Sequence, residues 1–184
     1  ELINSLPPLE NKLIDQYSQV WSCAASWRPH KRLAENIRYF LEHKGSNDCL
    51  IVAGDVKPGD RIKENNVYYV GSLNYEPLLR LYKSSDYFIH LAWLDHCPNV
   101  VVDAKAAGCK VICASAGGTA ELATDGDIIV MEDDWDFEPV ELYKPPKLSF
   151  ANKIVKKGNE LCYDMDNVSS RYEKFMKRVA NGKI

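Results

Sequence analysis

Six short apolar runs, separated by stretches with helical or turn character, are the sequence feature that most constrains the fold of this chain. The runs occupy residues 20–25, 50–53, 67–70, 87–92, 110–114 and 128–130. They are continuously apolar rather than alternating with polar residues, which is typical of strands buried on both faces of a parallel sheet. The alternating order predicts an α/β three-layer sandwich with a mostly parallel central sheet of about six strands.

The segments between the runs carry helical periodicity. Residues 30–44 and 76–85 each place their apolar side chains on one face of a helix. Residues 99–107 are rich in Val and Ala and apolar nearly all round, so we expect that helix to be buried.

The C-terminal part of the chain changes in character. Residues 132–147 mix acids with prolines and predict an irregular connection. A helical region at 148–181 is expected to follow, with two amphipathic helices over about 149–163 and 168–180.

Length and composition bound the class of protein. The 184 residues fit a single domain, residues 1–184, with a sheet core at about 18–131. The hydrophobic fraction of 46% and charged fraction of 27% are ordinary for a globular chain, and no apolar run approaches the roughly 20 residues of a membrane span. A net charge of −3 gives no long-range attraction to nucleic acid. We therefore expect no nucleic-acid partner, no transmembrane segment and a cytoplasmic location. These features are also compatible with a full-length enzyme that associates peripherally with a membrane.

The cysteines and the start of the chain carry two further expectations. The six cysteines are scattered and form no Cys-x-x-Cys pair, so we expect free thiols and no zinc site. The chain opens with Glu1 and has no leader pattern, which we interpret as a domain boundary.

The loop after the fourth run is the most constrained candidate site, because parallel sheets bind ligands beyond the carboxyl ends of their strands. Pro98 there begins a helix whose unpaired amides can hold a phosphate. Asp95 and Asp103 lie eight positions apart and can bracket an extended ligand such as a nucleoside diphosphate sugar. Alternatively, Asp95 caps the helix and Asp103 is a solvated or salt-bridged helix residue.

Three other loops are candidates for the same ligand. Arg28 and Lys31 follow the first run and can neutralise a diphosphate, although a helix start with exposed cations has the same sequence. Gly54 follows the second run, and the pair Gly117 and Gly118 after the fifth allows close backbone approach or a simple tight turn.

The histidines and the cysteine near this loop are weaker candidates. His96 adjoins Asp95 and is the histidine most suited to ligand contact. His90 is interpreted as a core or strand-end residue. Cys97 has no adjacent base, so we do not expect it to act as a nucleophile.

Residues 95–122 closely resemble the signature of a large family of retaining glycosyltransferases, group 1 or family four, whose members include sucrose synthases and bacterial mannosyl- and glucosyltransferases. That signature has two glutamates separated by seven residues and a later Gly-Gly-x-x-Glu segment. Here Asp95 and Asp103 take the two acidic positions, and Gly117, Gly118 and Glu121 form the later segment. The resemblance extends over roughly residues 20–131.

The resemblance implies a Rossmann-like lobe of the two-lobed GT-B architecture that binds a UDP- or GDP-sugar. In such a lobe Asp95 would lie at the donor sugar, Asp103 at the ribose, and Arg28 and Lys31 at the diphosphate. Further donor-binding positions would be His96, Cys97, Pro98, Asn99, Val100, Gly71, Ser72, Leu73, Gly54, Gly117 and Gly118. The family implies no metal and no cofactor. An N-terminal lobe absent from this sequence would bind the acceptor glycan, lipid or protein, and transfer would retain the anomeric configuration.

Two departures from the signature keep other functions open. Both glutamates are aspartates here, and Arg28 and Lys31 lie three positions apart rather than about five. The alternatives are a UDP-sugar epimerase of the same fold and a non-catalytic nucleotide- or carbohydrate-binding module. An NAD-dependent enzyme is least favoured, because no Gly-x-Gly-x-x-Gly follows the first run.

Overall fold

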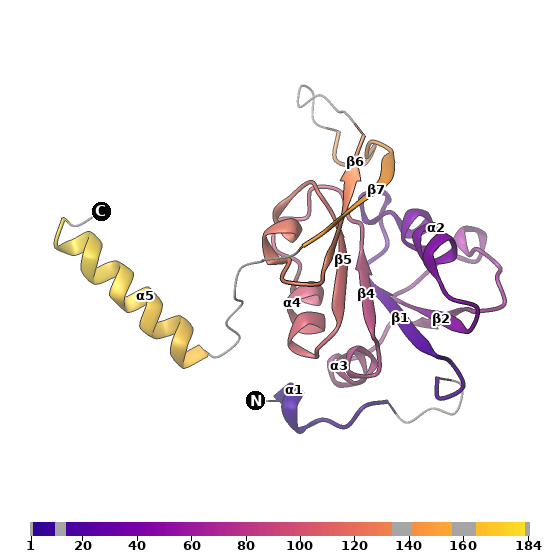
Figure 1. Cartoon of the computed structure of the whole chain (residues 1–184), viewed down its shortest axis with the longest axis horizontal. Helices are drawn as coiled ribbons and strands as arrows, with labels where there is room; N and C mark the ends of the chain where they lie inside the picture. The colour runs from indigo at the N-terminus through magenta and orange to yellow at the C-terminus, as the bar shows by residue number, and fades with distance from the viewer. Residues whose placement is uncertain (1, 10–13, 134–140, 156–164, 183–184) are drawn as a thin grey trace.

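The computed structural model describes residues 2–9, 14–133, 141–155 and 165–182. Strands and helices alternate through most of this length (Figure 1). The elements in chain order are α1 (Leu2–Ser5), β1 (Gln19–Ala24), η1 (Pro29–Lys31), α2 (Leu33–His43), β2 (Asp48–Ala53), η2 (Pro58–Asp60), β3 (Val67–Gly71), α3 (Tyr75–Lys83), β4 (Tyr87–His90), α4 (Asn99–Ala106), β5 (Lys110–Ala114), η3 (Gly118–Leu122), β6 (Ile128–Glu132), β7 (Leu148–Ile154) and α5 (Met165–Ala180). Among them are all six strands predicted from the apolar runs.

The seven described strands form one sheet in the order β3-β2-β1-β4-β5-β6-β7. Neighbours from β3 to β6 are parallel, and β7 pairs antiparallel with β6. From β1 the chain builds outward through β2 and β3, then returns to place β4 on the other side of β1. The strand order therefore reverses between β1 and β4, and a crevice opens beyond the carboxyl ends of strands at such a reversal.

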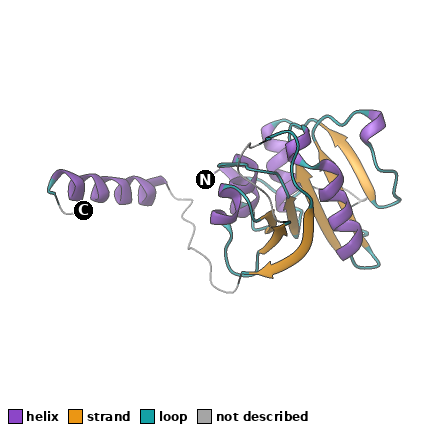
Figure 2. Ribbon diagram, turned by 90° about the horizontal axis from the view of Figure 1, so that it is seen from above, coloured by secondary structure: helices purple, strands orange, loops and turns teal. Residues whose placement is uncertain are grey.

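Two apolar layers cover the sheet. On one face the strand side chains pack with α3 and α4, where Leu79, Tyr82 and Val101 are buried. On the other face they pack with α2 through Ile37 and Phe40. Helices on both faces of a mostly parallel sheet make the three-layer α/β sandwich, Rossmann-like, that the sequence predicts (Figure 2).

The helix predicted over 149–163 is wrong where the structure can be compared with it. Residues Leu148–Ile154 are strand β7, and the remainder of the predicted helix lies outside the described residues. Leu148 and Phe150 alternate with polar neighbours and pack against the α2-side core, which is the period of a strand at a sheet edge. By pairing with β6, the segment satisfies backbone groups that an open edge would leave unpaired.

Two other expectations about helices have different outcomes. The expected burial of the helix over 99–107 is wrong, because only Val101 and Ala104 of α4 are buried. The other residues of α4 are partly buried, apart from the exposed Asn99. The helix expected over 168–180 is confirmed as α5, which lies apart from the sheet in Figure 1. Residues 166–182 are all exposed.

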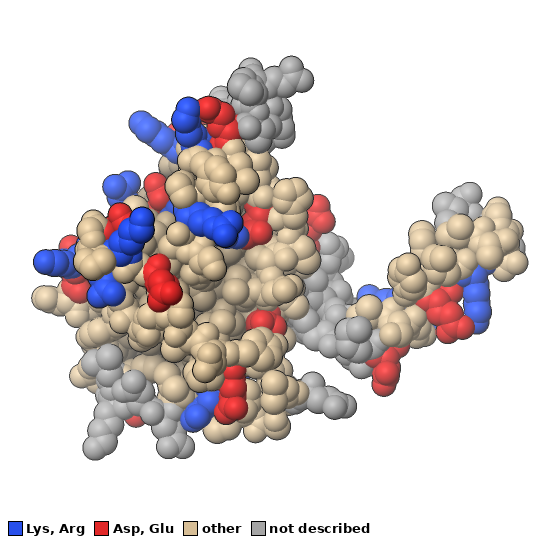
Figure 3. Space-filling model, turned by 180° about the vertical axis from the view of Figure 1, so that it is seen from behind, with Lys and Arg blue, Asp and Glu red and all other residues tan. Residues whose placement is uncertain are grey.

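Within the described segments, no helix combines the length and apolar character needed to cross a membrane. The face seen in Figure 3 carries acidic and basic side chains interspersed rather than in a patch of one sign. The charge distribution on this face therefore agrees with the small net charge of −3.

Candidate functional site: the crevice between β1 and β4

The loop from β4 to α4 packs closely against the backbone of the glycine pair Gly117 and Gly118. Asp95 forms an isolated parallel bridge with Gly117, and the Gly118 amide donates to the Asp95 carbonyl at 2.9 Å. Gly117 has φ of +90°, and a Cβ on Gly118 would lie 1.9 Å from the His96 carbonyl oxygen. Only glycines allow these two backbones to approach so closely, so the pair fixes the position of Asp95.

The Asp95 carboxylate collects donors from two other elements. Its Oδ2 accepts from the Lys31 ammonium, at the end of η1, and from His90 Nε2 at 2.8 Å, at the end of β4. The three side chains are mostly buried, with exposed fractions of 16% for Asp95, 19% for Lys31 and 4% for His90. The structure thus brings together Lys31 and Asp95, which lie 64 positions apart in the sequence.

These contacts set the charges of the site. The hydrogen bond from His90, followed by that from Lys31, holds the pKa of Asp95 well below its usual range, although burial opposes this shift. Burial lowers the pKa of His90. At neutral pH, Asp95 is therefore an anion and His90 a neutral imidazole whose Nε2–H donates to it.

His90 is a site residue that the sequence interpretation missed. A histidine at the last position of a buried strand was assigned to the core, and it is buried. The signal that could have identified it is its position, because the carboxyl end of β4 adjoins the crevice and Asp95 follows five residues later. A polar side chain there has a short path to that carboxylate.

Arg32, the third cation of the first loop, has a structural role. It is 2% exposed, adopts a left-handed backbone with φ of +51°, and donates two hydrogen bonds to Glu132 at 2.9 and 2.7 Å. A further bond reaches the Pro146 carbonyl at 2.6 Å. Arg32 therefore ties the start of α2 to the end of β6, and its guanidinium is already occupied.

Arg28 is exposed and, unlike Lys31, makes no contact with Asp95. It lines a cleft of about 530 Å³ together with Trp27 and residues after β2. Gly54 lies beside this cleft with φ of +105°, where a Cβ would be 2.1 Å from the Ala25 carbonyl oxygen. The close approach that Gly54 permits is therefore to the chain's own backbone and to Trp27.

The N-terminus of α4 presents free amides toward the crevice. Pro98 is its N-cap, and the first bonds onto the Pro98 carbonyl come from Val101 at 2.9 Å and Val102 at 3.3 Å. The amides of Asn99 and Val100 precede these bonds. No side chain caps the helix, so the alternative in which Asp95 is the cap is wrong. His96 and Cys97 in the preceding turn are exposed.

Asp103 lies one turn further along α4 and faces the start of α3. Its Oδ1 accepts from the Tyr75 hydroxyl at 3.4 Å, and burial raises the pKa of Asp103. The loop of Gly71, Ser72 and Leu73 leads from β3 into Tyr75. Through Tyr75, the start of α3 thus connects this loop to Asp103 on α4.

Potential metal ligands do not gather in the crevice. Across the described portions of the chain, no group of three or more His, Cys, Asp or Glu side chains is arranged to hold a metal ion.

Comparison with known proteins links this arrangement to carbohydrate chemistry. The family model for glycosyl transferases group 1 matches residues 27–137. A search of curated proteins found no match.

Three solved structures share the fold of this chain. HepE from Anabaena in complex with UDP-glucose is 21% identical with a TM-score of 0.56, covering 64% of this chain and 36% of its own. Sucrose-phosphate synthase from Thermosynechococcus elongatus is 14% identical with a TM-score of 0.53, covering 72% and 38%. The C-terminal domain of LpcC from Francisella tularensis, described as a glycosyl transferase group 1 family protein, is 16% identical with a TM-score of 0.53, covering 70% and 78%. The chain thus spans less than two fifths of the HepE and sucrose-phosphate synthase chains.

Proposed function

The chain belongs to the glycosyl transferases group 1 family, and from this premise we propose that it is the donor-binding lobe of a retaining glycosyltransferase that uses a nucleoside diphosphate sugar. The observation that carries the proposal is the crevice itself, where Asp95 is fixed by Lys31 and His90 in front of the free amides of α4. An ionised acid, a cation and a helix N-terminus at one point match a ligand with sugar hydroxyls and phosphates.

The geometry of α4 orients the donor. The diphosphate lies at the amides of Asn99 and Val100, and the sugar extends to Asp95. The ribose reaches Asp103, which is four residues or about 6 Å along the helix from Asn99. The base then lies against the loop of Gly71 to Leu73, beside Tyr75.

The ionisation of Asp95 defines what it does in transfer. Its low pKa means that it does not donate a proton at neutral pH. As an anion it accepts hydrogen bonds from the donor sugar and offsets the positive charge that the ring gains as the anomeric bond breaks. The electron pair of that bond leaves with the diphosphate, which Lys31 and the α4 amides stabilise. An acceptor hydroxyl oxygen then bonds to the anomeric carbon, and its proton passes to the departing phosphate oxygen.

To stabilise the departing diphosphate, Lys31 must contact the phosphate as well as Asp95. Without donor it is paired with Asp95, so a diphosphate competes with that carboxylate for the same ammonium group. We assign the diphosphate role to Lys31 and not to Arg28, because Arg28 lines the neighbouring cleft. The donor therefore binds with Lys31 shared between Asp95 and phosphate.

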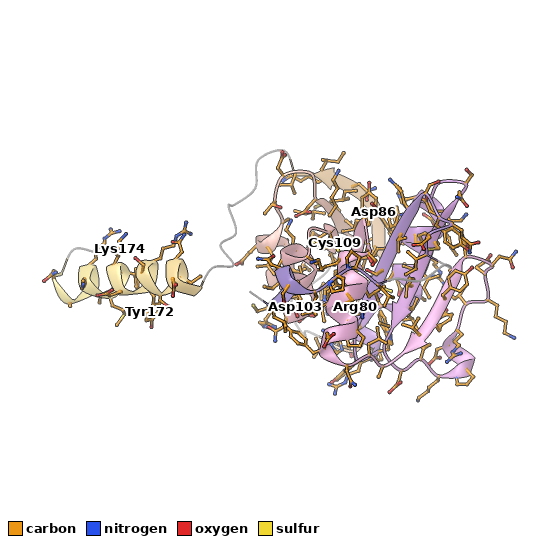
Figure 4. The ribbon with its side chains drawn as sticks, turned by 90° about the horizontal axis from the view of Figure 1, so that it is seen from below. Arg80, Asp86, Asp103, Cys109, Tyr172 and Lys174 are labelled. Atoms are coloured by element: carbon orange, nitrogen blue, oxygen red, sulfur yellow. The ribbon has the colours of Figure 1, made fainter. Side chains whose placement is uncertain are left out.

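The acceptor-binding lobe is proposed to lie in a further part of the enzyme. Helix α5 supports this, because its apolar side chains Val168, Tyr172, Phe175, Met176 and Val179 are all exposed. Tyr172 and Lys174 project from opposite sides of the helix (Figure 4). An amphipathic helix of this kind needs an apolar partner surface.

Calorimetric titration of the chain with UDP, GDP and their glucose and mannose conjugates tests the donor site. We expect one of the two nucleotides to bind, with affinity unchanged by EDTA, because the proposed site uses no metal. Lys31→Met is expected to weaken that nucleotide about tenfold and to leave the free nucleoside unaffected, whereas Lys63→Met, an exposed lysine after η2, changes neither. Absence of binding by every nucleotide at millimolar concentration contradicts the proposal.

The same site is compatible with the two alternatives from the sequence, and turnover separates them. Incubating the full-length enzyme with UDP-N-acetylglucosamine and following the sugar by NMR distinguishes transfer or hydrolysis from epimer formation. A binding module produces neither change.

A further inference from the structure

A second cleft lies beside the donor crevice, between the loops that follow β1 and β2. Its volume is about 530 Å³, within the range of about 300–1,000 Å³ typical of small-molecule sites. It opens on the α2 side of the sheet, whereas Asp103 and Tyr75 lie on the α3 and α4 side. The side chains that characterise it are Trp27, Arg28, Glu35, Asp55, Lys57 and Asp60.

The indole of Trp27 is a fixed wall of this cleft. Its Nε1–H donates to the Ala53 carbonyl at 2.9 Å. Gly54 packs under the ring, where a Cβ would lie 2.8 Å from Trp27 Nε1. Trp27 is nevertheless only partly buried, so a rigid aromatic surface remains open to a ligand.

The charged groups around Trp27 are uncommitted. Glu35, Asp55, Asp60, Arg28 and Lys57 make no ion pair or side-chain hydrogen bond with any other part of the chain that the structure describes. Arg32 also lines the cleft, but its charge is paired with Glu132. The three carboxylates and the two remaining cations therefore give the cleft no excess of positive charge. A phosphate or other anion is therefore disfavoured, whereas a neutral ligand with many hydroxyl groups can donate to the carboxylates and accept from Arg28 and Lys57.

We propose that this cleft supplements the acceptor site of the further lobe by binding one sugar ring of a carbohydrate acceptor, with its C–H face on Trp27 and its hydroxyls on the surrounding carboxylates. Sugar C–H groups carry a slight positive charge and pack against the negative face of an aromatic ring. The charge balance disfavours a nucleotide, and the density of carboxylates disfavours a lipid chain. Carbohydrate binding itself is independent of the donor site. Its role as acceptor binding rests on the proposed function.

The position of the cleft suits an acceptor. Arg28 borders the cleft and Lys31 contacts Asp95. Only Pro29 and His30 lie between these two residues in the sequence. The step from the extended Arg28 to Pro29 spans about 3.3 Å, and the two steps within η1 rise about 2 Å each, so the backbone between the two sites spans roughly 7 Å. A saccharide that fills the cleft and extends over this turn reaches the donor sugar.

The test uses the full 184-residue chain labelled with ¹⁵N, with the indole N–H of Trp27 as the reporter. Maltose, lactose, cellobiose, mannobiose and diacetylchitobiose are titrated separately, followed by uridine, guanosine and UDP. We expect at least one disaccharide to shift the Trp27 indole signal and the nucleosides and UDP to leave it unchanged. Trp27→Phe keeps an aromatic face and identifies the signal. Asp55→Asn combined with Asp60→Asn is expected to weaken the disaccharide about tenfold.

Matched controls make each outcome decisive. Asp125→Asn removes an exposed carboxylate remote from the cleft and is expected to leave disaccharide binding unchanged. Failure of all five disaccharides to shift Trp27 overturns the proposal, as does a shift caused by uridine or guanosine alone, which assigns the cleft to a nucleobase. If a disaccharide binds but no nucleotide binds anywhere, the sugar site stands and the donor function fails. Nucleotide binding with no disaccharide binding gives the reverse result.

Discussion

Replacing Asp95 with Asn separates its charge from its structural contacts. In the unliganded chain Asp95 pairs with Lys31 and accepts a hydrogen bond from His90. Asparagine keeps the shape and a carbonyl oxygen that can still accept from His90, but it carries no charge. The variant therefore releases Lys31 while retaining the backbone contacts of Asp95 with Gly117 and Gly118.

The effect on nucleotide affinity follows from the distances involved. If Lys31 contacts both groups at about 3 Å, a bound diphosphate lies roughly 6 Å from the Asp95 carboxylate. Two like unit charges at that separation repel by about 3 kcal/mol at an effective dielectric constant of 20. Screening over a Debye length of about 8 Å reduces this to about 1.3 kcal/mol. We therefore expect Asp95→Asn to bind UDP about tenfold more tightly than the unaltered chain.

Calorimetric titration with UDP measures this change, and Asp125→Asn is the matched control because it alters the net charge equally at an exposed site away from the crevice. In the full-length enzyme the same Asp95→Asn substitution is expected to slow transfer by about 10²–10³, because the anion at the sugar is gone. Tighter nucleotide binding with slower turnover is the result that supports a shared Lys31. Unchanged or weaker UDP binding would refute the competition between Asp95 and the diphosphate.

Three further predictions concern stability. Burial lowers the pKa of His90 and of His30 in the folded chain. Below the pKa of an unfolded-chain histidine, near 6.5, the unfolded chain therefore binds protons that the folded chain does not. The free energy of unfolding decreases as pH falls through this range. Urea unfolding at pH 7, 6 and 5 should show this decline, and His90→Gln should lessen it. Gly118→Ala places a Cβ 1.9 Å from the His96 carbonyl oxygen and should cost about 1–3 kcal/mol in the same assay, while Gly59→Ala, with open space around it, should be near neutral. Arg32→Met leaves the Glu132 side chain, which is 4% exposed, buried without its cation, and should lower the free energy of unfolding by about 3–5 kcal/mol. A second substitution, Glu132→Leu, should restore most of this loss. A melting temperature unaffected by Arg32→Met alone contradicts the structural role of Arg32.

Strands β1, β2, β4 and β5 could be predicted from the sequence because they are buried on both faces and form unbroken apolar runs. Strands β3 and β6 are only partly buried, but short apolar runs mark them as well. β7 escaped this reasoning because an edge strand is only half covered, and its alternation of Leu148 and Phe150 with polar residues was read as helical amphipathicity. The pattern of a short edge strand is easily mistaken for a helix when no neighbouring strand is known. Its pairing with β6 is a tertiary fact that the local sequence does not contain.

The candidate site likewise contains some features that the sequence predicts and others that it does not. The position of Asp95 before α4, and of Asp103 within it, follows from local spacing and was predictable. The contacts of Asp95 with Lys31 and of Arg32 with Glu132 join residues 64 and 100 positions apart, and spacing along the chain does not indicate them. His90 could have been recognised only by asking which polar groups lie at the carboxyl ends of the strands beside the crevice.

The separation of Arg28 from Lys31 has a backbone cause. In a 3₁₀ turn, side chains three residues apart lie on the same side, so a regular turn through both would aim them at one phosphate. Arg28 stands outside that turn as its N-cap, with an extended backbone at φ −129° and ψ 162°. Arg32 ends the turn in a left-handed conformation that its bonds to Glu132 maintain. The buried ion pair thereby fixes where the turn ends, and one basic loop supplies a cation to each of two neighbouring sites.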